Sequence, residues 1–198
     1  GTDLVTASAL IQAVKAINPD IVVLEEGTTG GSCELTPLGE LGAGANGFVE
    51  RCRLKISGDN FEQLVAVKRF HTTQRPNVQQ VNHFLREASV LGCLSHPNII
   101  RLLGIGTVDG TLQRLYTALE LAAGPSLLSV LERQVVAPGM AAYSTRDALR
   151  WCIQIASALM YIHTQHHLIH RDIKLRNLAL TADDPSVADI KLLDWGLA

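Results

Sequence analysis

The sequence predicts an α+β protein whose strand-rich first half is followed by a mainly helical second half. Strand-forming runs separated by turns occupy most of the chain from Leu35 to Glu120, and a single amphipathic segment interrupts them. Gly124-Pro125 then breaks the pattern, and apolar residues at helical spacing dominate the rest of the chain. A chain of 198 residues has room for one sizeable core or for two small lobes that share a cleft.

The first 33 residues have a pattern of their own. Ala7 to Ile17 has the apolar spacing of a short amphipathic helix, which Asn18-Pro19 should stop, and Ile21 to Leu24 is typical of a brief strand. Gly27 to Cys33 has the composition of a linker. We therefore expect residues 1–33 to be an N-terminal extension, or the end of a preceding domain, without chemistry of its own.

Five strands and one helix are expected between residues 34 and 121. Apolar residues recur at helical spacing from Val78 to Ser95, and Gly92 with His96-Pro97 marks the end of this helix. The strands share β-branched or apolar residues bounded by turns, and they are Leu38 to Leu41, Phe48 to Ile56, Leu64 to Phe70, Ile99 to Leu103 and Leu115 to Leu121. The first three should form an antiparallel meander.

Two helices and a hairpin are expected between residues 122 and 198. Ser126 should cap a short helix that runs to Arg133. Ser144 to Asp147 resembles a capping box, and the helix after it, to about His163, is so apolar that we expect it to be almost wholly buried. A hairpin with its turn at Asp183 to Pro185 comes next.

Composition and charge argue against several classes of function. The net charge of −2 gives no electrostatic basis for binding nucleic acid or an anionic membrane. No apolar run is long enough to insert across a bilayer, and no signal peptide is recognisable. The four cysteines lie far apart without metal-binding or disulfide spacing, so we expect free thiols and a cytoplasmic protein.

A glycine-rich turn lies between the first two expected strands. Gly42-Ala43-Gly44-Ala45-Asn46-Gly47 fits the pattern G-x-G-x-x-G, in which missing Cβ atoms let the backbone approach a phosphate group. A dinucleotide-dependent oxidoreductase would need a helix directly after this motif, but Phe48 to Leu54 has the pattern of a strand. Taken alone, the motif favours a hairpin turn that binds no ligand.

A lysine and a glutamate form a candidate pair. Val65-Ala66-Val67-Lys68 places Lys68 on a strand beside the glycine-rich turn, where its charge could meet the phosphates of a nucleotide. Glu87 falls among apolar residues on its helix, so its carboxylate needs a partner. We expect Glu87 to pair with Lys68 and to direct the lysine toward the nucleotide; an exposed strand lysine is the alternative.

The strongest motif is His170-Arg171-Asp172-Ile173-Lys174-Leu175-Arg176-Asn177. It matches the H-R-D-x-x-x-x-N catalytic loop of protein kinases at every defined position. Together with the preceding motifs, it makes the chain resemble a eukaryotic-type protein kinase from about Leu35 to Ala198. The resemblance implies a protein-kinase-like two-lobed fold: an antiparallel-sheet N-lobe with one main helix at residues 34–121, and the first, helical part of a C-lobe at residues 122–198.

The resemblance also implies the roles of individual residues. Asp172 would accept the proton of the substrate hydroxyl, Asn177 and Asp194 would each hold Mg²⁺, and Lys68 would bind the α- and β-phosphates of ATP. Lys174 is typical of kinases that phosphorylate Ser or Thr in protein substrates. The run His96 to Gly104 is similar to the tyrosine-kinase-like group, whose members are mostly Ser/Thr enzymes.

The adenine site is implied by the same resemblance. The residues that would surround adenine, including the gatekeeper Leu119 and the hinge after it, are Val49, Ala66, Leu119, Glu120, Leu121 and Ala179. Two positions depart from the family pattern. Ala179 stands where a larger apolar residue is usual, which makes the adenine floor shallower, and Trp195 of Asp194-Trp195-Gly196 stands where most kinases have Phe, which alters the switching of this segment.

The resemblance leaves alternatives open. The activation segment, the A-P-E motif and the later helices are missing from the sequence, so we expect a C-terminally incomplete catalytic domain, weak or inactive alone, with apolar helix surface exposed. A nucleotide-binding pseudokinase or scaffold without transfer activity is the alternative. A zinc site would need a histidine cluster, and the candidates, which also fit the ordinary run of a kinase into its catalytic loop, are His163, His166, His167 and His170.

Overall fold

The strand-rich and helical parts of the chain form separate units in the computed structural model. The structure describes residues 6–25, 32–44, 47–58, 61–70, 76–108, 111–136 and 141–198. The first unit comprises Gly1–Cys93 and Leu102–Leu121, and the second comprises Leu94–Arg101 and Ala122–Ala198. The predicted α+β class is confirmed. No helix in the described ranges is both long and apolar enough to cross a membrane.

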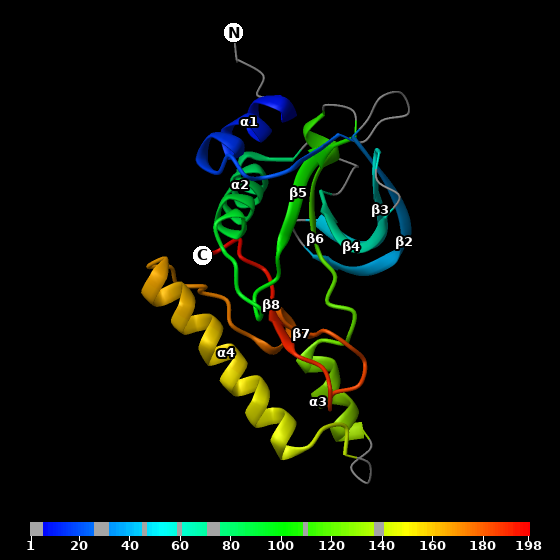
Figure 1. Cartoon of the computed structure of the whole chain (residues 1–198), viewed down its shortest axis with the longest axis vertical. Helices are drawn as coiled ribbons and strands as arrows, with labels where there is room; N and C mark the ends of the chain where they lie inside the picture. Colours follow the sequence, from blue (N-terminus) through cyan, green and yellow to red (C-terminus); the bar gives the residue numbers. More distant parts are fainter. Residues whose placement is uncertain are drawn as a thin grey trace. The chain divides into compact units, whose positions relative to one another are not determined.

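The first unit is built on a six-stranded sheet in the order β1-β5-β6-β4-β3-β2 (Figure 1). Its strands are β1 (Val23–Glu25), β2 (Cys33–Gly44), β3 (Gly47–Ile56), β4 (Glu62–Arg69), β5 (Leu102–Thr107) and β6 (Leu115–Glu120). A short 3-10 helix, η1 (Leu112–Arg114), leads into β6. β2, β3 and β4 form the predicted antiparallel meander, whereas β1 pairs parallel with β5 at one edge of the sheet.

The strand expected at Ile99 to Leu103 was placed wrongly. β5 begins at Leu102 and contains Gly104 and Gly106, which are depleted in strands and therefore hide it in the sequence. Ile99 and Ile100 belong to the second unit, where the Ile100 N–H donates to the carbonyl oxygen of Leu192 at 3.0 Å. Both side chains are buried, so their apolar character reflects a core position outside the six-stranded sheet.

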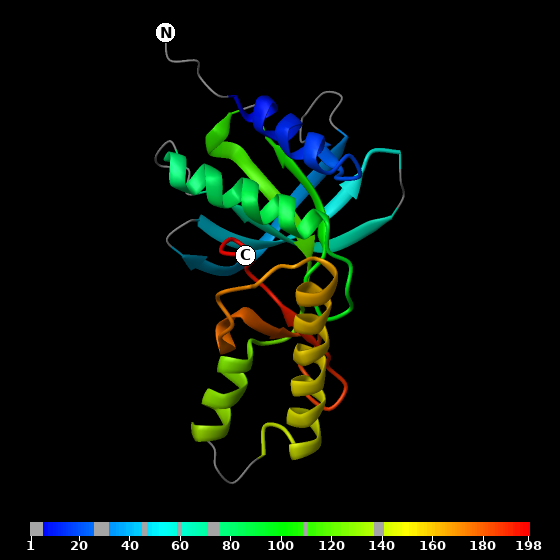
Figure 2. The same ribbon diagram turned by 90° about the vertical axis from the view of Figure 1, so that its left-hand side faces the viewer.

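Two helices cover one face of the sheet. α1 (Ala7–Ile17) and α2 (Val78–Gly92) lie on the same side of it in both views (Figures 1 and 2). Both helices were predicted, although α2 ends three residues before the expected Ser95. One hydrophobic core contains buried side chains of α1, α2 and β5, among them Leu10, Val14, Phe84, Ala88 and Ile105. A second core contains residues of several strands, including Leu24, Leu54, Val65, Val67 and Tyr116.

The second unit contains two helices and a small hairpin. Its elements are α3 (Leu127–Val136), α4 (Thr145–Gln165), η2 (Leu175–Asn177), β7 (Leu178–Leu180) and β8 (Ile190–Leu192). β7 and β8 form the predicted antiparallel hairpin; α3 contacts β7, and α4 contacts β8. Ser126 accepts a hydrogen bond from the Ser129 N–H, and Ser144 with Asp147 forms a complete capping box, so both predicted helix starts are confirmed.

The expectation that α4 is almost wholly buried is wrong. Its buried residues are Asp147, Trp151, Ala158 and Ile162. Leu149, Ile153 and Met160 have 59%, 69% and 63% of their surface exposed. The helix carries apolar residues on more than one face, and the described residues cover only one of them. The exposed apolar surface that the sequence predicted is therefore present.

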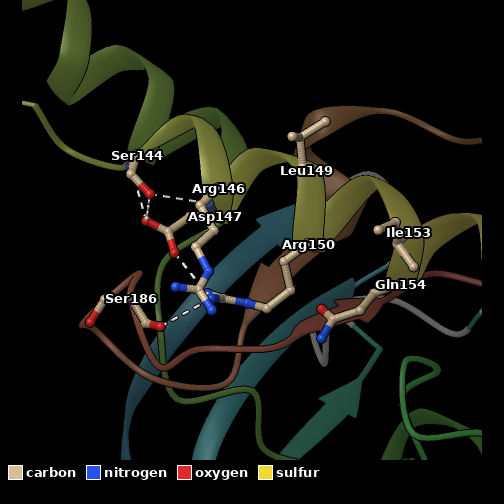
Figure 3. A pocket seen from close by; sticks show the side chains of 8 residues that line it. All are labelled: Ser144, Arg146, Asp147, Leu149, Arg150, Ile153, Gln154 and Ser186. Atoms are coloured by element: carbon tan, nitrogen blue, oxygen red, sulfur yellow. Dashed lines mark hydrogen bonds and ion pairs between the residues drawn. The ribbon is translucent and has the colours of Figure 1, made fainter.

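Arg150 ties the start of α4 to the connection between β7 and β8. It forms an ion pair with Asp147 at 3.0 Å and donates to the carbonyl oxygens of Pro185, Ser186 and Ala188 at 2.6, 3.0 and 3.1 Å. Arg150, Asp147 and Ser186 are among the residues that line a hollow at this place (Figure 3). Because Arg150 is engaged in holding α4 to the β7–β8 connection, we assign this place a structural role.

Candidate active site

Four of the predicted nucleotide-binding residues share one face of the six-stranded sheet. Val49 pairs with Lys68 across β3 and β4, and Ala66 pairs with Leu119 across β4 and β6. Directly paired residues project to the same face, as do residues two apart on one strand. The register therefore brings Val49, Ala66, Lys68 and Leu119 together on one surface of the first unit.

The ion pair expected between Lys68 and Glu87 is present. The Lys68 Nζ lies 2.5 Å from Glu87 Oε2, and the Glu87 side chain is only 4% exposed. A buried carboxylate is costly unless a cation compensates it, so the two groups hold each other in place. The pair joins α2 to β4 and fixes the head of the lysine.

The glycines of the glycine-rich turn differ in how much room the fold leaves for a side chain. Gly47 has φ +147°, and a Cβ there would lie 2.0 Å from the Arg69 carbonyl oxygen. Gly42, which pairs with Val49, has open space where a Cβ would be. Ala43 pairs with Phe48, and Gly44 pairs with Gly47. Ala45 and Asn46 lie outside the described residues. The fold itself thus requires glycine at position 47 and leaves room beside position 42.

The two residues expected to form the hinge lie at the end of β6 and directly after it. Glu120 is the last residue of β6 and pairs with Val65, and Leu121 is the last residue of the first unit. One residue of this strand was missed by sequence reasoning. Thr117 pairs with Lys68 on the same face, and its buried Oγ1 has no hydrogen-bond partner among the described residues. A threonine within an apolar strand gives no sequence signal for such a position.

The catalytic-loop motif forms a cluster in the second unit. The Lys174 ammonium donates to Asp172 Oδ2 at 2.6 Å, and Asn177 Nδ2 donates to the same oxygen and to the Asp172 carbonyl, both at 2.9 Å. The hydrogen bond from Lys174, assisted by the Asn177 amide, holds the pKa of Asp172 below its usual range. Asp172 is therefore an ionised, oriented acceptor at neutral pH.

His170 holds this loop through two hydrogen bonds of its buried ring. Its Nε2 lies 2.9 Å from the Leu193 carbonyl oxygen, and its Nδ1 lies 3.3 Å from the Asp172 N–H. A neutral ring satisfies both contacts, with Nε2–H as donor and Nδ1 as acceptor. Burial lowers the pKa of His170, against the hydrogen bond to Leu193, which raises it. The sequence placed His170 in the motif without revealing this function.

The Asp-Trp-Gly motif follows β8, and the residue before it is hydrogen-bonded to the Asp172 loop. The Leu193 N–H donates to the Asn177 carbonyl oxygen at 2.8 Å, which brings the start of the motif next to Asn177. Asp194 has φ +59°, and Arg171 has φ +65°, a conformation that few non-glycine residues adopt; His167, just before the loop, shares it with φ +53°. Carboxylate and amide oxygens are ligands that Mg²⁺ accepts, so the donor set of Asn177 and Asp194 fits this metal.

Trp195 and Ala179, the two residues that depart from the family pattern, are both buried. Trp195 is fully buried, its ring meets His170 edge-on at 4.6 Å, and its Nε1 lies 3.4 Å from the Leu192 carbonyl oxygen. Ala179 is buried in β7, where it pairs with Lys191. The larger ring of Trp195 is thus accommodated in the core of the second unit, in contact with His170.

The four histidines weighed as zinc ligands are engaged separately or exposed. His166 lies 2.9 Å from the Tyr161 hydroxyl, and His170 bonds to Leu193. His163 and His167 are exposed. Within the described part of the chain, these four side chains do not bring their ring nitrogens together.

Comparison with known proteins assigns most of the chain to one family. The protein kinase domain family matches residues 35–198, which covers the sheet-borne Lys68–Glu87 pair and the Asp172 loop. The chain therefore belongs to the protein kinase family, whose chemistry is phosphoryl transfer, and its two-part α+β fold is kinase-like.

The similar proteins include kinases of different specificity. A probable myosin light chain kinase of Dictyostelium discoideum is 34% identical over 80% of this chain and 37% of its own length. The melanoma receptor tyrosine-protein kinase of Xiphophorus maculatus is 34% identical over 80% of this chain and 12% of its own length. NUAK family SNF1-like kinase 2 of Homo sapiens is 33% identical over 80% and 22%, respectively. The matched part is thus a minor share of each relative.

Proposed function

We propose that this protein transfers the γ-phosphoryl group of Mg-ATP to Ser or Thr hydroxyls of protein substrates. The observation that carries the proposal is the cluster in which Lys174 and Asn177 hold an ionised Asp172. In this role Asp172 orients the substrate hydroxyl and accepts its proton as the phosphoryl group transfers. Lys174, a cation beside the acceptor, offsets charge on the transferred group.

The remaining candidate residues bind the nucleotide in this proposal. Mg²⁺ supplies charge neutralisation at the phosphates when it is bound, and Asn177 and Asp194 are the residues that would hold it. Lys68, fixed by Glu87, would bind the α- and β-phosphates beneath the glycine-rich turn, Gly42 to Gly47. Adenine would lie against the apolar sheet face and the hinge of the first unit, formed by Val49, Ala66, Leu119, Glu120 and Leu121. Ala179 of β7 is the remaining residue proposed for adenine binding.

Specificity for Ser or Thr rests on Lys174, since the relatives include both a receptor tyrosine-protein kinase and other kinases. Because the chain covers only a minor share of these relatives, we propose that transfer needs residues beyond these 198, and that these 198 residues alone are weak or inactive in transfer. A cytoplasmic location stays a prediction.

Calorimetric titration with ATP tests the nucleotide part of the proposal. We expect binding that requires Mg²⁺ and that weakens about tenfold or more in Asp194→Asn, because a metal ligand is lost. Asp183→Asn is the matched control, since it makes the same change at an exposed position of the β7–β8 connection. Equal affinities in all three proteins, with and without Mg²⁺, contradict the assigned metal site. Binding without transfer in a longer protein favours the pseudokinase alternative.

A further inference from the structure

Residues 6–25 precede the matched kinase region but are built into the first unit. α1 contributes the buried side chains Ala7, Leu10, Ile11 and Val14 to the core that also contains Phe84 and Ala88 of α2. β1 extends the sheet through parallel pairing with β5, in which the Ile105 N–H donates to the Val22 carbonyl oxygen at 3.0 Å. This segment therefore contacts both the sheet and the helix that carries Glu87.

The matched region has features that fit β1 specifically. A Cβ on Gly106 would lie 2.0 Å from the Leu24 carbonyl oxygen, and one on Gly104 would lie 2.9 Å from the Leu24 side chain. The buried Tyr116 hydroxyl donates to the same Leu24 carbonyl at 3.0 Å. β1 is thus one of the neighbours that leave no room for a side chain at these two glycines, and it supplies an acceptor for the Tyr116 hydroxyl.

Asn18 fastens the segment to the end of α2. Its Nδ2 donates to the carbonyl oxygen of Gly92, the last residue of α2, and its Oδ1 accepts from the Asp20 N–H at 3.1 Å. Terminal carbonyls of a helix lack intrahelical partners, so this bond caps α2 from outside. A Cβ on Gly92 would lie 2.7 Å from Ile21 Cδ1 and 2.8 Å from Asn18 Nδ2, which shows how closely the segment is seated.

We propose that residues 6–25 are a positioning element for phosphate binding, in which Asn18 anchors α2 so that Glu87 keeps Lys68 directed at the nucleotide. The effect on phosphate binding rests on the proposed function, whereas the anchoring of α2 by Asn18 does not. α2 contacts both β5 of the sheet and α1, and α1 also contacts β5. Loosening the α1 side would free α2 to move, and with it the Glu87 carboxylate that fixes the lysine.

The test compares Asn18→Asp with Asn82→Asp in the whole chain. The carboxylate introduced by Asn18→Asp would keep the acceptor for the Asp20 N–H and lose the amide that donates to the Gly92 carbonyl and to Cys93 Sγ at the end of α2. Asn82 is exposed on α2 itself. Gly92→Ala is a second variant, because alanine favours the helix yet displaces Asn18 and Ile21. Each variant is titrated with Mg-ATP and with adenosine, and hydrogen exchange of residues 84–92 is measured without nucleotide.

We expect Asn18→Asp and Gly92→Ala to weaken Mg-ATP binding about fivefold while adenosine binding stays within about twofold, because only the phosphate contact depends on Lys68. Exchange in α2 should be faster in Asn18→Asp than in Asn82→Asp. In a Glu87→Gln background, the same changes should weaken Mg-ATP no further, since the pair through which they act is already lost.

Other results overturn the inference. Equal losses of ATP and adenosine affinity would indicate general destabilisation, and equal behaviour of Asn18→Asp and Asn82→Asp would remove the anchor. If Asn18→Asp does not fold, Gly92→Ala decides by the same readouts. Failure of the unaltered chain to bind Mg-ATP contradicts the proposed function instead, and the exchange of α2 then still decides whether Asn18 holds the helix.

Discussion

At the scale of single residues, the protonation state of His170 decides whether the Asp172 loop keeps two of its hydrogen bonds. His170 is buried between the Leu193 carbonyl and the Asp172 amide, and only its neutral form satisfies both. Protonation would place an N–H against the Asp172 N–H. The lowered pKa of His170 therefore follows from its burial and agrees with its bonding.

The stability of the chain should depend on pH through His170. Because its pKa is lowered in the fold, the unfolded chain takes up the proton first, so this contribution is complete above about pH 6.5 and is lost as pH falls toward the folded pKa. Urea unfolding between about pH 5 and pH 7.5 measures the effect. His96, whose pKa is lowered by burial and by Lys191, acts in the same direction.

His170→Gln should therefore flatten the pH dependence in part. The exposed His163→Gln variant should keep the slope of the unaltered chain. If both variants have the same slope as the unaltered chain, His170 does not titrate as its surroundings imply.

Lys174 should affect transfer far more than binding. In the proposed mechanism it holds Asp172 and faces the transferred group, so Lys174→Ala should lower the rate of transfer to a Ser peptide by about 10²-fold and leave Mg-ATP affinity within about twofold. Steady-state kinetics of a longer protein containing these residues, with calorimetry beside it, measure both. Lys55→Ala, at an exposed position of β3, is the control; an unchanged Lys174→Ala rate would refute the role of Lys174.

At the scale of elements, the β2–β3 hairpin contains one glycine that the fold requires, Gly47, and one that it does not, Gly42. Gly47→Ala should lower the free energy of unfolding by about 2 kcal/mol or more, because its φ of +147° and the nearby Arg69 carbonyl both exclude a side chain. Gly42→Ala should be nearly neutral for stability, since its Cβ meets open space. Denaturant unfolding of both variants checks this, and equal losses would contradict it.

The start of α4 depends on Arg150 in the same way. Arg150→Leu removes an ion pair and three hydrogen bonds to backbone carbonyls, so we expect a loss of about 2 kcal/mol or more in the free energy of unfolding. Arg146→Leu, four residues earlier on an exposed face of the helix, should change it by less than about 0.5 kcal/mol. A similar effect of the two substitutions would show that the connection is not held by Arg150.

The sequence located most of these elements but only some of their partners. Periodicity found α1, α2 and α4 because it is a local property, and the buried charge of Glu87 predicted its pairing with Lys68. Local pattern could not show that β1 joins β5 or that Asn18 reaches Gly92, because these contacts join distant parts of the chain. It also overestimated the burial of α4, since apolar residues do not reveal which faces are covered.

At the scale of the whole molecule, the chain provides two sets of groups that phosphoryl transfer needs. The first unit presents a fixed lysine on an apolar sheet face, and the second presents an ionised aspartate with candidate metal ligands nearby. Transfer of this kind relies mainly on positioning and on charge stabilisation. The family membership and the geometry of each unit lead to the same expectation.

The most direct test is transfer of labelled γ-phosphate from Mg-ATP to Ser, Thr and Tyr peptides by a longer protein containing these residues. We predict transfer to Ser and Thr that falls at least about 10³-fold in Asp172→Asn while Mg-ATP binding persists. Asp183→Asn, on the exposed hairpin turn, should retain the activity. Absence of transfer despite Mg-ATP binding, or unchanged transfer in Asp172→Asn, would contradict the account of this protein as a kinase that uses Asp172.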